Sequence, residues 1–266
     1  MDNVNGLLLV AKIAAAVTIV IAAARATDRA GPFLGAMIAT LPVSTGPVYV
    51  FLAMDHDAHF ISESARMSVA GTAGTVAFIA AHAFASRHFA TPLSLATATL
   101  AWLGVALLLQ LRDWSFVEAC AVLVATFTLA IRGLRRFGAA SPVVPGVPVA
   151  PPRFDLALRA GLVSCVVIAT TLAGNFLGPA TTGVLATYPV VFTSLVLILQ
   201  PRSGGPFTAS MLVSGLKGLI GFGVALGVLH LAAARMSSAW ALLIALGVAV
   251  GWNYALFLLR KRQLAR

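Results

Sequence analysis

The chain alternates between long apolar runs and short polar breaks. A helix needs about 20 apolar residues to cross the roughly 30 Å hydrocarbon core of a bilayer. By that measure the pattern predicts nine transmembrane helices, at 6–26, 32–54, 64–86, 93–111, 115–132, 155–177, 179–200, 207–233 and 238–259. We therefore expect an all-α, polytopic membrane protein, because a helix satisfies its own backbone hydrogen bonds inside a bilayer.

Composition excludes most other classes of protein. Of the 266 residues, 60% are apolar and 10% are charged, whereas soluble domains average about 45–50% apolar and about 25% charged. These values exclude an ordinary soluble enzyme, a disordered chain and a water-filled β-barrel.

The net charge of +10 comes mainly from basic residues in the short segments between apolar runs. With the N-terminus outside, 13 of the 18 Lys and Arg residues fall in cytoplasmic segments and 3 fall in outer loops. Cytoplasmic loops of membrane proteins carry such an excess. We therefore expect a multi-pass protein of the cell inner (plasma) membrane, with the N-terminus outside, the C-terminus in the cytoplasm and no nucleic-acid partner.

Two parts of the sequence match at an offset of 147 positions. The segment 39–43 (ATLPV) recurs at 186–190 (ATYPV), and Lys12 falls on Arg159. The glycine pairs at this offset are Gly31 with Gly178, Gly71 with Gly218, Gly74 with Gly221 and Gly104 with Gly251. Five predicted helices separate the starts of the two copies. Because five is odd, the copies run in opposite directions across the membrane, as in many secondary transporters.

The repeat predicts the domain organisation. Repeat one (helices 1–4) covers 1–111, a connector helix covers 112–132, and repeat two (helices 6–9) covers 154–266. Between the connector and repeat two, the segment 133–153 contains five prolines. Dense proline favours a semi-rigid, extended chain, so this segment is interpreted as a cytoplasmic linker.

Three features mark copy one: a basic residue early in the first helix, a proline in the second, and a basic residue that opens the third. The first two recur in copy two. Copy one has Lys12, Pro42 and Arg66, and copy two has Arg159 and Pro189, with Val213 in place of the third basic residue. In these features each copy resembles the GlpM-like group of small four-helix membrane proteins and the related DUF3147 proteins. The resemblance covers roughly 1–110 and 155–262. It implies a duplicated and fused membrane unit, and no particular activity.

Pro42 and Pro189 occupy equivalent positions in the middle of predicted helices. Proline removes a backbone hydrogen bond and frees a carbonyl, which must find a partner in a bilayer. Paired interruptions in two inverted halves indicate a substrate site; alternatively, both prolines are structural kinks whose carbonyls bind nearby hydroxyls. The polar residues beside the prolines, which we also predict to contact substrate, are Thr40, Ser44, Thr45, Thr187, Tyr188 and Thr193.

Three basic residues lie inside apolar runs. Lys12 and Arg159 either snorkel to the membrane surface or form an anion site. Lys217 lies deep in the run 207–233, with Glu118 as a candidate ion partner. Because charges within membrane helices are costly and mark functional sites, we include all three basic residues in the predicted substrate site.

The remaining polar candidates have two interpretations each. The loop 55–59 (DHDAH) is either a solvated acidic loop or a site for a divalent metal. His82 and His230 are either a proton relay, because histidine titrates near neutral pH, or hydrogen-bonded helix residues. Trp252 is typical of an interfacial anchor. No cofactor and no bound metal are expected.

Function is predicted from this architecture. The sequence contains no motif for nucleotide binding, zinc hydrolysis or a serine nucleophile, so we expect no enzyme. We expect a secondary transporter that moves a small anionic or amphipathic solute between inverted repeats by alternating access. The alternative is a non-transporting accessory subunit of an envelope membrane complex. The expected partners are the lipid bilayer and a small-molecule substrate; a homodimer and an envelope-complex partner stay open.

Overall fold

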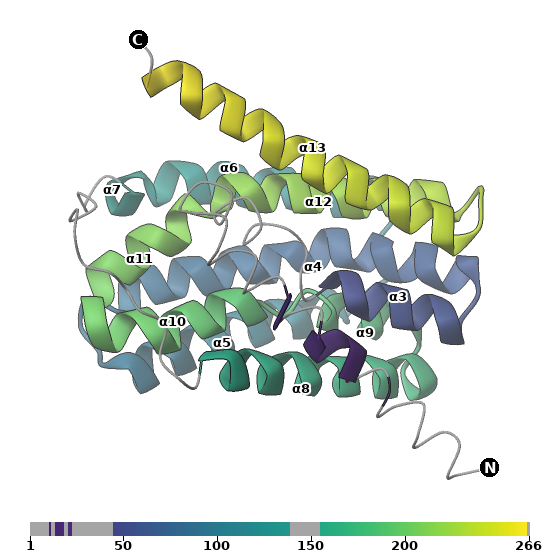
Figure 1. Cartoon of the computed structure of the whole chain (residues 1–266), viewed down its shortest axis with the longest axis horizontal. Coiled ribbons are helices and arrows are strands. Elements are labelled where there is room, and N and C mark those ends of the chain that lie inside the picture. The colour runs from purple at the N-terminus through teal and green to yellow at the C-terminus, as the bar shows by residue number, and fades with distance from the viewer. Residues whose placement is uncertain (1–10, 12–13, 19–20, 23–44, 139–154, 265–266) are drawn as a thin grey trace.

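The computed structural model describes residues 11, 14–18, 21–22, 45–138 and 155–264, and these residues form helices joined by short turns (Figure 1). The helices are α3 (Thr45–Asp55), α4 (Ala58–Ala85), α5 (Thr91–Leu109), α6 (Phe116–Gly133), α7 (Arg135–Gly138), α8 (Asp155–Phe176), α9 (Gly178–Leu185), α10 (Val190–Ser203), α11 (Gly205–Ser214), α12 (Leu216–Ala233) and α13 (Ser238–Leu264).

Seven helical segments are long and apolar enough to cross a membrane, so the chain is a multi-pass helical membrane protein. They are Ala58–Ala85, Thr91–Leu109, Phe116–Gly133, Ala157–Phe176, Gly178–Ser203, Gly205–Ala233 and Ser238–Leu259. Each overlaps one predicted helix. Most of the run 6–26 and most of the run 32–54 lie outside the described residues, so the count of nine helices stays a prediction.

Helix α4 lies at the centre of the bundle. Within its apolar window 78% of the residues are buried, against 28% in α5, 22% in α6 and 17% in α13. The exposed side chains of these three outer helices include Leu100, Leu107, Val124 and Leu129. Because lipid solvates apolar side chains, we assign these outer surfaces to the bilayer.

Helix α4 runs antiparallel to the pair α11 and α12. Ser62, near the start of α4, hydrogen-bonds to His230, near the end of α12. Ser86, which caps the end of α4, donates to the carbonyl of Gly205 at the start of α11 (3.4 Å). The two helical segments therefore lie side by side over their whole length, in opposite directions (Figure 1).

Corresponding helices begin at the spacing found in the sequence. Helix α4 begins at Ala58 and α11 at Gly205, and α5 begins at Thr91 and α13 at Ser238; both pairs are 147 positions apart. Helix α5 packs on α4, and α13 packs on α12.

A glycine and a tryptophan meet in each of these two helix pairs. A Cβ on Gly74 of α4 would lie 3.0 Å from the indole of Trp102 on α5, and a Cβ on Gly221 of α12 would collide with Trp252 of α13. Gly74 and Gly221 are again 147 positions apart.

The two ends of the bundle carry opposite charge. At one end the start of α4, the start of α6 and the end of α12 lie together, as shown by the contacts of His230 with Ser62 and Phe116. At the other end the end of α4, α7 and the start of α11 lie together, as shown by the contacts of Phe84 with Phe137 and of Ser86 with Gly205. We call the first the α3–α4 end and the second the α4–α5 end. The described acidic residues at the α3–α4 end are Asp55, Asp57, Glu63, Asp113 and Glu118, which outnumber the arginines there, Arg66, Arg112 and Arg235. The described basic residues at the α4–α5 end include Arg87, Arg132, Arg135, Arg136 and Arg202.

Candidate functional site

A membrane-length helix is interrupted beside Pro189. Helix α9 ends at Leu185 and α10 begins at Val190, so the span Gly178–Ser203 consists of two helices joined by the non-helical residues 186–189, which we call the break. Pro189 lacks an N–H group and stands at the N-cap of α10, with φ −81° and ψ 65°. The sequence predicts one helix over 179–200 with a proline in its middle. The helix divides instead, and hydroxyl groups of neighbouring helices bind carbonyls that a continuous helix would pair within itself.

Two hydroxyl groups of α4 bind carbonyls at and before the break. Ser68 Oγ donates to the carbonyl of Gly183 (2.6 Å), and Thr75 Oγ1 donates to the carbonyl of Thr187 (2.8 Å). The hydroxyl of Tyr49 on α3 lies 2.6 Å from Ser68 Oγ. All five residues are buried, and an unpaired carbonyl in hydrocarbon is strongly unfavourable. These contacts make the break compatible with a membrane interior.

Thr45 and Thr187 supply two further hydroxyl groups. Thr45 Oγ1 on α3 donates to the carbonyl of Ala186 (3.1 Å), and Thr187 Oγ1 donates back to the carbonyl of Val184 (2.6 Å). Thr45 is only 7% exposed and Thr187 only 3%. Two residues predicted from opposite halves of the sequence therefore meet at the break.

The hydroxyl groups of α4 belong to a continuous feature that sequence reasoning missed. We define the polar stripe of α4 as Ser64, Ser68, Thr72, Thr75, His82 and Ser86, all of them buried. Its members recur at every third or fourth residue, except that Ile79 interrupts the series, so they share one face of the helix. The signal in the sequence was this spacing of hydroxyl residues within an otherwise apolar run.

Small residues allow α4 to approach α9 and the break. A Cβ on Gly71 would lie 2.8 Å from Thr187 Oγ1, and a Cβ on Gly183 would collide with the carbonyl oxygen of Ser64. Small residues at helix interfaces let membrane helices pack closely. This approach brings the short hydroxyl side chains of α4 within hydrogen-bonding distance of the carbonyls of α9.

A small pocket lies between α5 and α9, beside the break. Its volume is about 90 Å³, and its lining includes Trp102, Gln110 and Thr181. Tyr188 of the break packs edge-on against Trp102, with ring centroids 5.0 Å apart, and its hydroxyl oxygen accepts from Thr193 Oγ1 (3.4 Å). The lining is mainly apolar, and its polar groups are the indole, the amide and the threonine hydroxyl.

The predicted site residues divide into three sets. Thr45, Thr187, Tyr188, Pro189 and Thr193 lie at the break or contact it. The residues Lys12, Thr40, Pro42 and Ser44 lie outside the described part of the chain. The third set is Arg159, half-buried in the second turn of α8, and Lys217 of α12, which lie on helices other than α9 and α10.

Lys217 lies in the first turn of α12, with an exposed side chain. The predicted ion pair between Lys217 and Glu118 is wrong. Glu118 pairs instead with Arg112, and it accepts from the backbone N–H and hydroxyl of Ser115 at the start of α6. A carboxylate in the first turn of a helix is stabilised by the free N–H groups there, which explains the change of partner.

Trp252 packs against α12, and its role as an interfacial anchor stays a prediction. Its Nε1 donates to the carbonyl of Lys217 (2.9 Å), and its ring covers Gly221. The donor of a tryptophan ring needs a partner in an apolar setting, and the carbonyl near the α11–α12 junction supplies it.

A second buried polar cluster lies near the α4–α5 end. His82 Nε2 is 2.9 Å from Gln200 Oε1, which also accepts from the hydroxyl of Ser94 (2.9 Å). The amide nitrogen of Gln200 donates to the carbonyl of Phe89 (3.3 Å). His82 is fully buried, and its Nδ1 has no hydrogen-bond partner among the described residues. The cluster joins α4 and α5 to α10, the second half of the interrupted helix.

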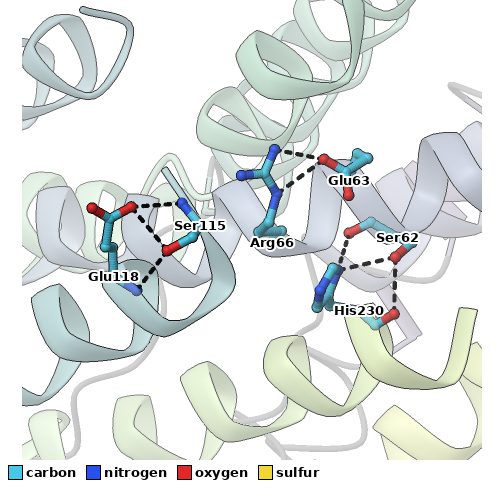
Figure 2. A network of polar contacts seen from close by, with 6 residues as sticks. All are labelled: Ser62, Glu63, Arg66, Ser115, Glu118 and His230. Atoms are coloured by element: carbon cyan, nitrogen blue, oxygen red, sulfur yellow. Dashed lines mark hydrogen bonds and ion pairs between the residues drawn. The ribbon is translucent and has the colours of Figure 1, made fainter. Parts of the chain in front are cut away.

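Figure 2 shows the polar contacts at the opposite, α3–α4 end. The ring Nδ1–H of His230 donates to the carbonyl of Ser62 (2.9 Å), and the hydroxyl of Ser62 donates to the carbonyl of His230 (2.9 Å). Arg66 donates twice to one oxygen of Glu63, at 2.9 and 2.5 Å. The Ser62–His230 contacts hold the start of α4 against the end of α12, whereas the Arg66–Glu63 ion pair lies within α4.

The segment 55–59, which was predicted as a loop, contains the N-terminus of helix α4. Asp57 accepts from the backbone N–H of Phe60 (2.8 Å) and is the N-cap of α4, while His56 stacks on Phe60. Within the described residues, no three His, Cys, Asp or Glu side chains are grouped as metal ligands. The hydrogen bond from Phe60 shows that Asp57 serves as a helix cap.

Comparison of the chain with protein-family models, curated protein sequences and solved structures gives no match. The resemblance to the GlpM-like group therefore stays a prediction from the sequence.

Proposed function

We propose that this chain is a secondary transporter that binds a small amphipathic solute at the break of residues 186–189 and moves it by alternating access. The observation that carries the proposal is the interrupted helix itself. Unwound backbone within a membrane helix is tolerated where it is enclosed by protein or lines a cavity, and discontinuous helices form the substrate sites of many transporters.

The hydroxyl groups around the break are suited to exchange partners. Ser68, Thr75 and Thr45 each bind a carbonyl of the interrupted helix, and a hydroxyl both donates and accepts hydrogen bonds. A polar group of a solute that enters the break would take over some of these contacts. No backbone carbonyl would then be left unpaired during the exchange.

The amphipathic class is favoured by what surrounds the break. The described residues that contact it carry no formal charge, and the neighbouring pocket beside Trp102 is mainly apolar. Lys217, the predicted binder of an anionic group, is exposed on α12 and makes no contact with the break. We therefore place an amphipathic solute ahead of a simple inorganic anion.

Two inverted repeats support alternating access as the mechanism. The antiparallel course of α4 and α11–α12, and the helix starts 147 positions apart, are the arrangement expected of inverted copies. Hydrogen bonds between the two proposed repeats occur at both ends, through His230 and Gln200, and in the middle, through Thr187. The structure then corresponds to an occluded state, and each end opens when its own contacts break.

The proposal is tested by ligand stabilisation of the purified protein in detergent. The panel contains short-chain carboxylic acids, alcohols and amides, with inorganic phosphate as an anion that has no apolar part. A solute that binds only the folded state at 100 times its Kd adds about 2.7 kcal/mol of stability. We expect a rise in melting temperature with amphipathic members of the panel, followed by uptake of the same solute in proteoliposomes.

Thr187→Val is the informative variant, because it removes the hydroxyl at the break and keeps the shape of the side chain. It should lose the stabilisation by solute. Thr97→Val is the matched control, since Thr97 Oγ1 binds only the carbonyl of Leu93 within its own helix. Equal stabilisation of both variants would contradict the site at the break. A well-folded protein that responds to no solute but co-purifies with a stoichiometric protein would favour the accessory-subunit alternative.

A further inference from the structure

His82 combines features that do not occur together elsewhere among the described histidines. Its side chain is fully buried, one ring nitrogen is hydrogen-bonded and the other, Nδ1, has no partner. Gln200 Oε1 is an acceptor, so Nε2 carries the ring hydrogen and Nδ1 carries an unshared lone pair. A buried polar atom without a partner calls for an explanation.

The polar cluster around His82 excludes a proton from this nitrogen. A proton on Nδ1 would create an imidazolium ion whose new N–H has no acceptor, within a fully buried site. An unpaired charge of this kind is strongly unfavourable in a protein interior. The neutral ring is therefore the only form that fits between α4, α5 and α10 as they are packed here.

Charged groups nearby do not compensate an imidazolium at His82. The guanidinium groups of Arg87 and Arg136 lie over the rings of Phe137 and Phe84, at 4.2 and 5.3 Å. The other charged or titratable residues described on α4 are His59, Glu63 and Arg66. On the helices that contact α4 they are Tyr49 and Asp55 on α3, Glu118, Cys120 and Arg132 on α6, Arg135 and Arg136 on α7, Arg202 on α10, and Lys217 and His230 on α12. The described residues of α5, α9 and α11 include no charged or titratable side chain. The carboxylates in this set all belong to the α3–α4 end of the bundle.

From this geometry we infer that His82 is the proton-binding site of the protein, and that proton binding at Nδ1 and the packed position of α10 exclude one another. Protonation then favours a state in which α10 has separated from α4 at Gln200 and water reaches the ring. Two processes that exclude one another are linked thermodynamically. Acidification opens the α4–α5 end, and deprotonation closes it.

The inference rests on the proposed function in one respect, because a proton that opens one end of a transporter is its coupling ion. Gln200 lies in the last turn of α10, and the first residue of this helix, Val190, follows the break directly. A displacement of Gln200 is thereby transmitted along α10 to residues 186–189. The coupling would be lost if Gln200 no longer contacted His82.

The test measures protonation of the His82 ring directly, without any added solute. The full-length protein is labelled with ¹⁵N-histidine, placed in lipid nanodiscs and titrated from pH 8 to pH 5 by NMR. The chain has 5 histidines, and the signals of His82 are identified by their absence in His82→Gln. Hydrogen exchange of the α10 amides, measured over the same range, reports the separation of α10.

We expect His82 to change from the neutral Nε2–H form to imidazolium in this range, and protection of the α10 amides to fall with the same midpoint. In His82→Gln the pH-dependent loss of protection should disappear, whereas the matched variant His230→Gln should retain it. Ser94→Ala removes one donor to Gln200 and should move the midpoint to higher pH, by about 0.5 to 1 pH unit. This second variant keeps the inference testable if His82→Gln does not fold.

Two outcomes would overturn the inference: a His82 ring that stays neutral to pH 5, or α10 protection that falls equally with and without His82. Neither outcome would decide whether the protein carries a solute. Conversely, a solute panel without a hit would leave a measured proton transition at His82 unaffected, so the two proposals fail separately.

Discussion

Thr75 illustrates how one hydroxyl group supports an interruption in a membrane helix. It lies on the most buried helix, and its Oγ1 is the partner of the Thr187 carbonyl. In a continuous helix this carbonyl would accept from the N–H four residues later, and the break at 186–189 ends that pairing. The break and the threonine are therefore one structural unit, although 112 positions separate them in the sequence.

Thr75→Val should destabilise the protein by about 1–3 kcal/mol, because it leaves a buried carbonyl without a partner while keeping the side-chain volume. Thr75→Ser should restore most of the loss, since it returns the hydroxyl. The measurement is the free energy of unfolding, or the melting temperature, of each purified variant in the same detergent. A loss that serine does not repair would show that packing of the methyl group, rather than the hydrogen bond, is the important contribution.

At the scale of elements, α4 was correctly predicted as a membrane-length helix, but its first residue was predicted wrongly. The sequence places its first residue at 64, after the polar loop, whereas the helix begins at Ala58. The reason is Asp57, whose side chain accepts from the N–H of Phe60 and begins the helix inside a segment that looks solvated. Charge alone does not separate a capping residue from a loop residue.

The interruption at 186–189 was only half predictable. Proline at 189 predicts a distorted helix, but the same sequence pattern is expected for a kinked helix and for two separate helices. The choice between them depends on Ser68 and Thr75, whose hydroxyl groups reach the freed carbonyls from a different helix. Such partners become visible only when the packing of α4 against α9 is known.

The antiparallel pairing of α4 with α11 and α12 is open to a direct test by cross-linking. With Cys120 and Cys165 replaced by serine, Ser62→Cys combined with His230→Cys should react with a short bifunctional thiol reagent to form an internal cross-link. The reason is that the Ser62 hydroxyl and the His230 carbonyl are only 2.9 Å apart.

The control pair combines Ser62→Cys with Ser210→Cys. Ser210 lies on α11, near the opposite end of the bundle, so this pair should not react. Cross-linking of the control in preference to Ser62 with His230 would indicate a parallel arrangement and would remove the main support for inverted repeats.

At the scale of the whole molecule, the apolar runs were sufficient to predict a multi-pass helical protein. Seven of the predicted helices correspond to membrane-length helices of the structure. The structure also shows an uneven distribution of charge, because carboxylates outnumber arginines at the α3–α4 end and arginines are in excess at the α4–α5 end among the described residues. Which end faces the cytoplasm is a matter of insertion and stays a prediction of the positive-inside rule.

Orientation in the cell can be read from two exposed turns. In the background without native cysteines, His88→Cys at the α4–α5 end should react with a membrane-impermeant maleimide only after the cells are permeabilised. Asp113→Cys at the α3–α4 end should react with intact cells. Both residues are exposed in the structure. The reverse pattern would place the arginine-rich end outside and contradict the predicted topology.

The position of the hydroxyl partners also bears on how the protein is made. A ribosome releases the chain from its N-terminus, so α3 and α4 are synthesised long before residue 186. Thr45, Ser68 and Thr75 are therefore already in the membrane when the interrupted helix arrives. The segment least suited to a bilayer on its own is made after the groups that shelter it, and a chain expressed from repeat two alone would present unpaired carbonyls to the quality-control proteases of the membrane.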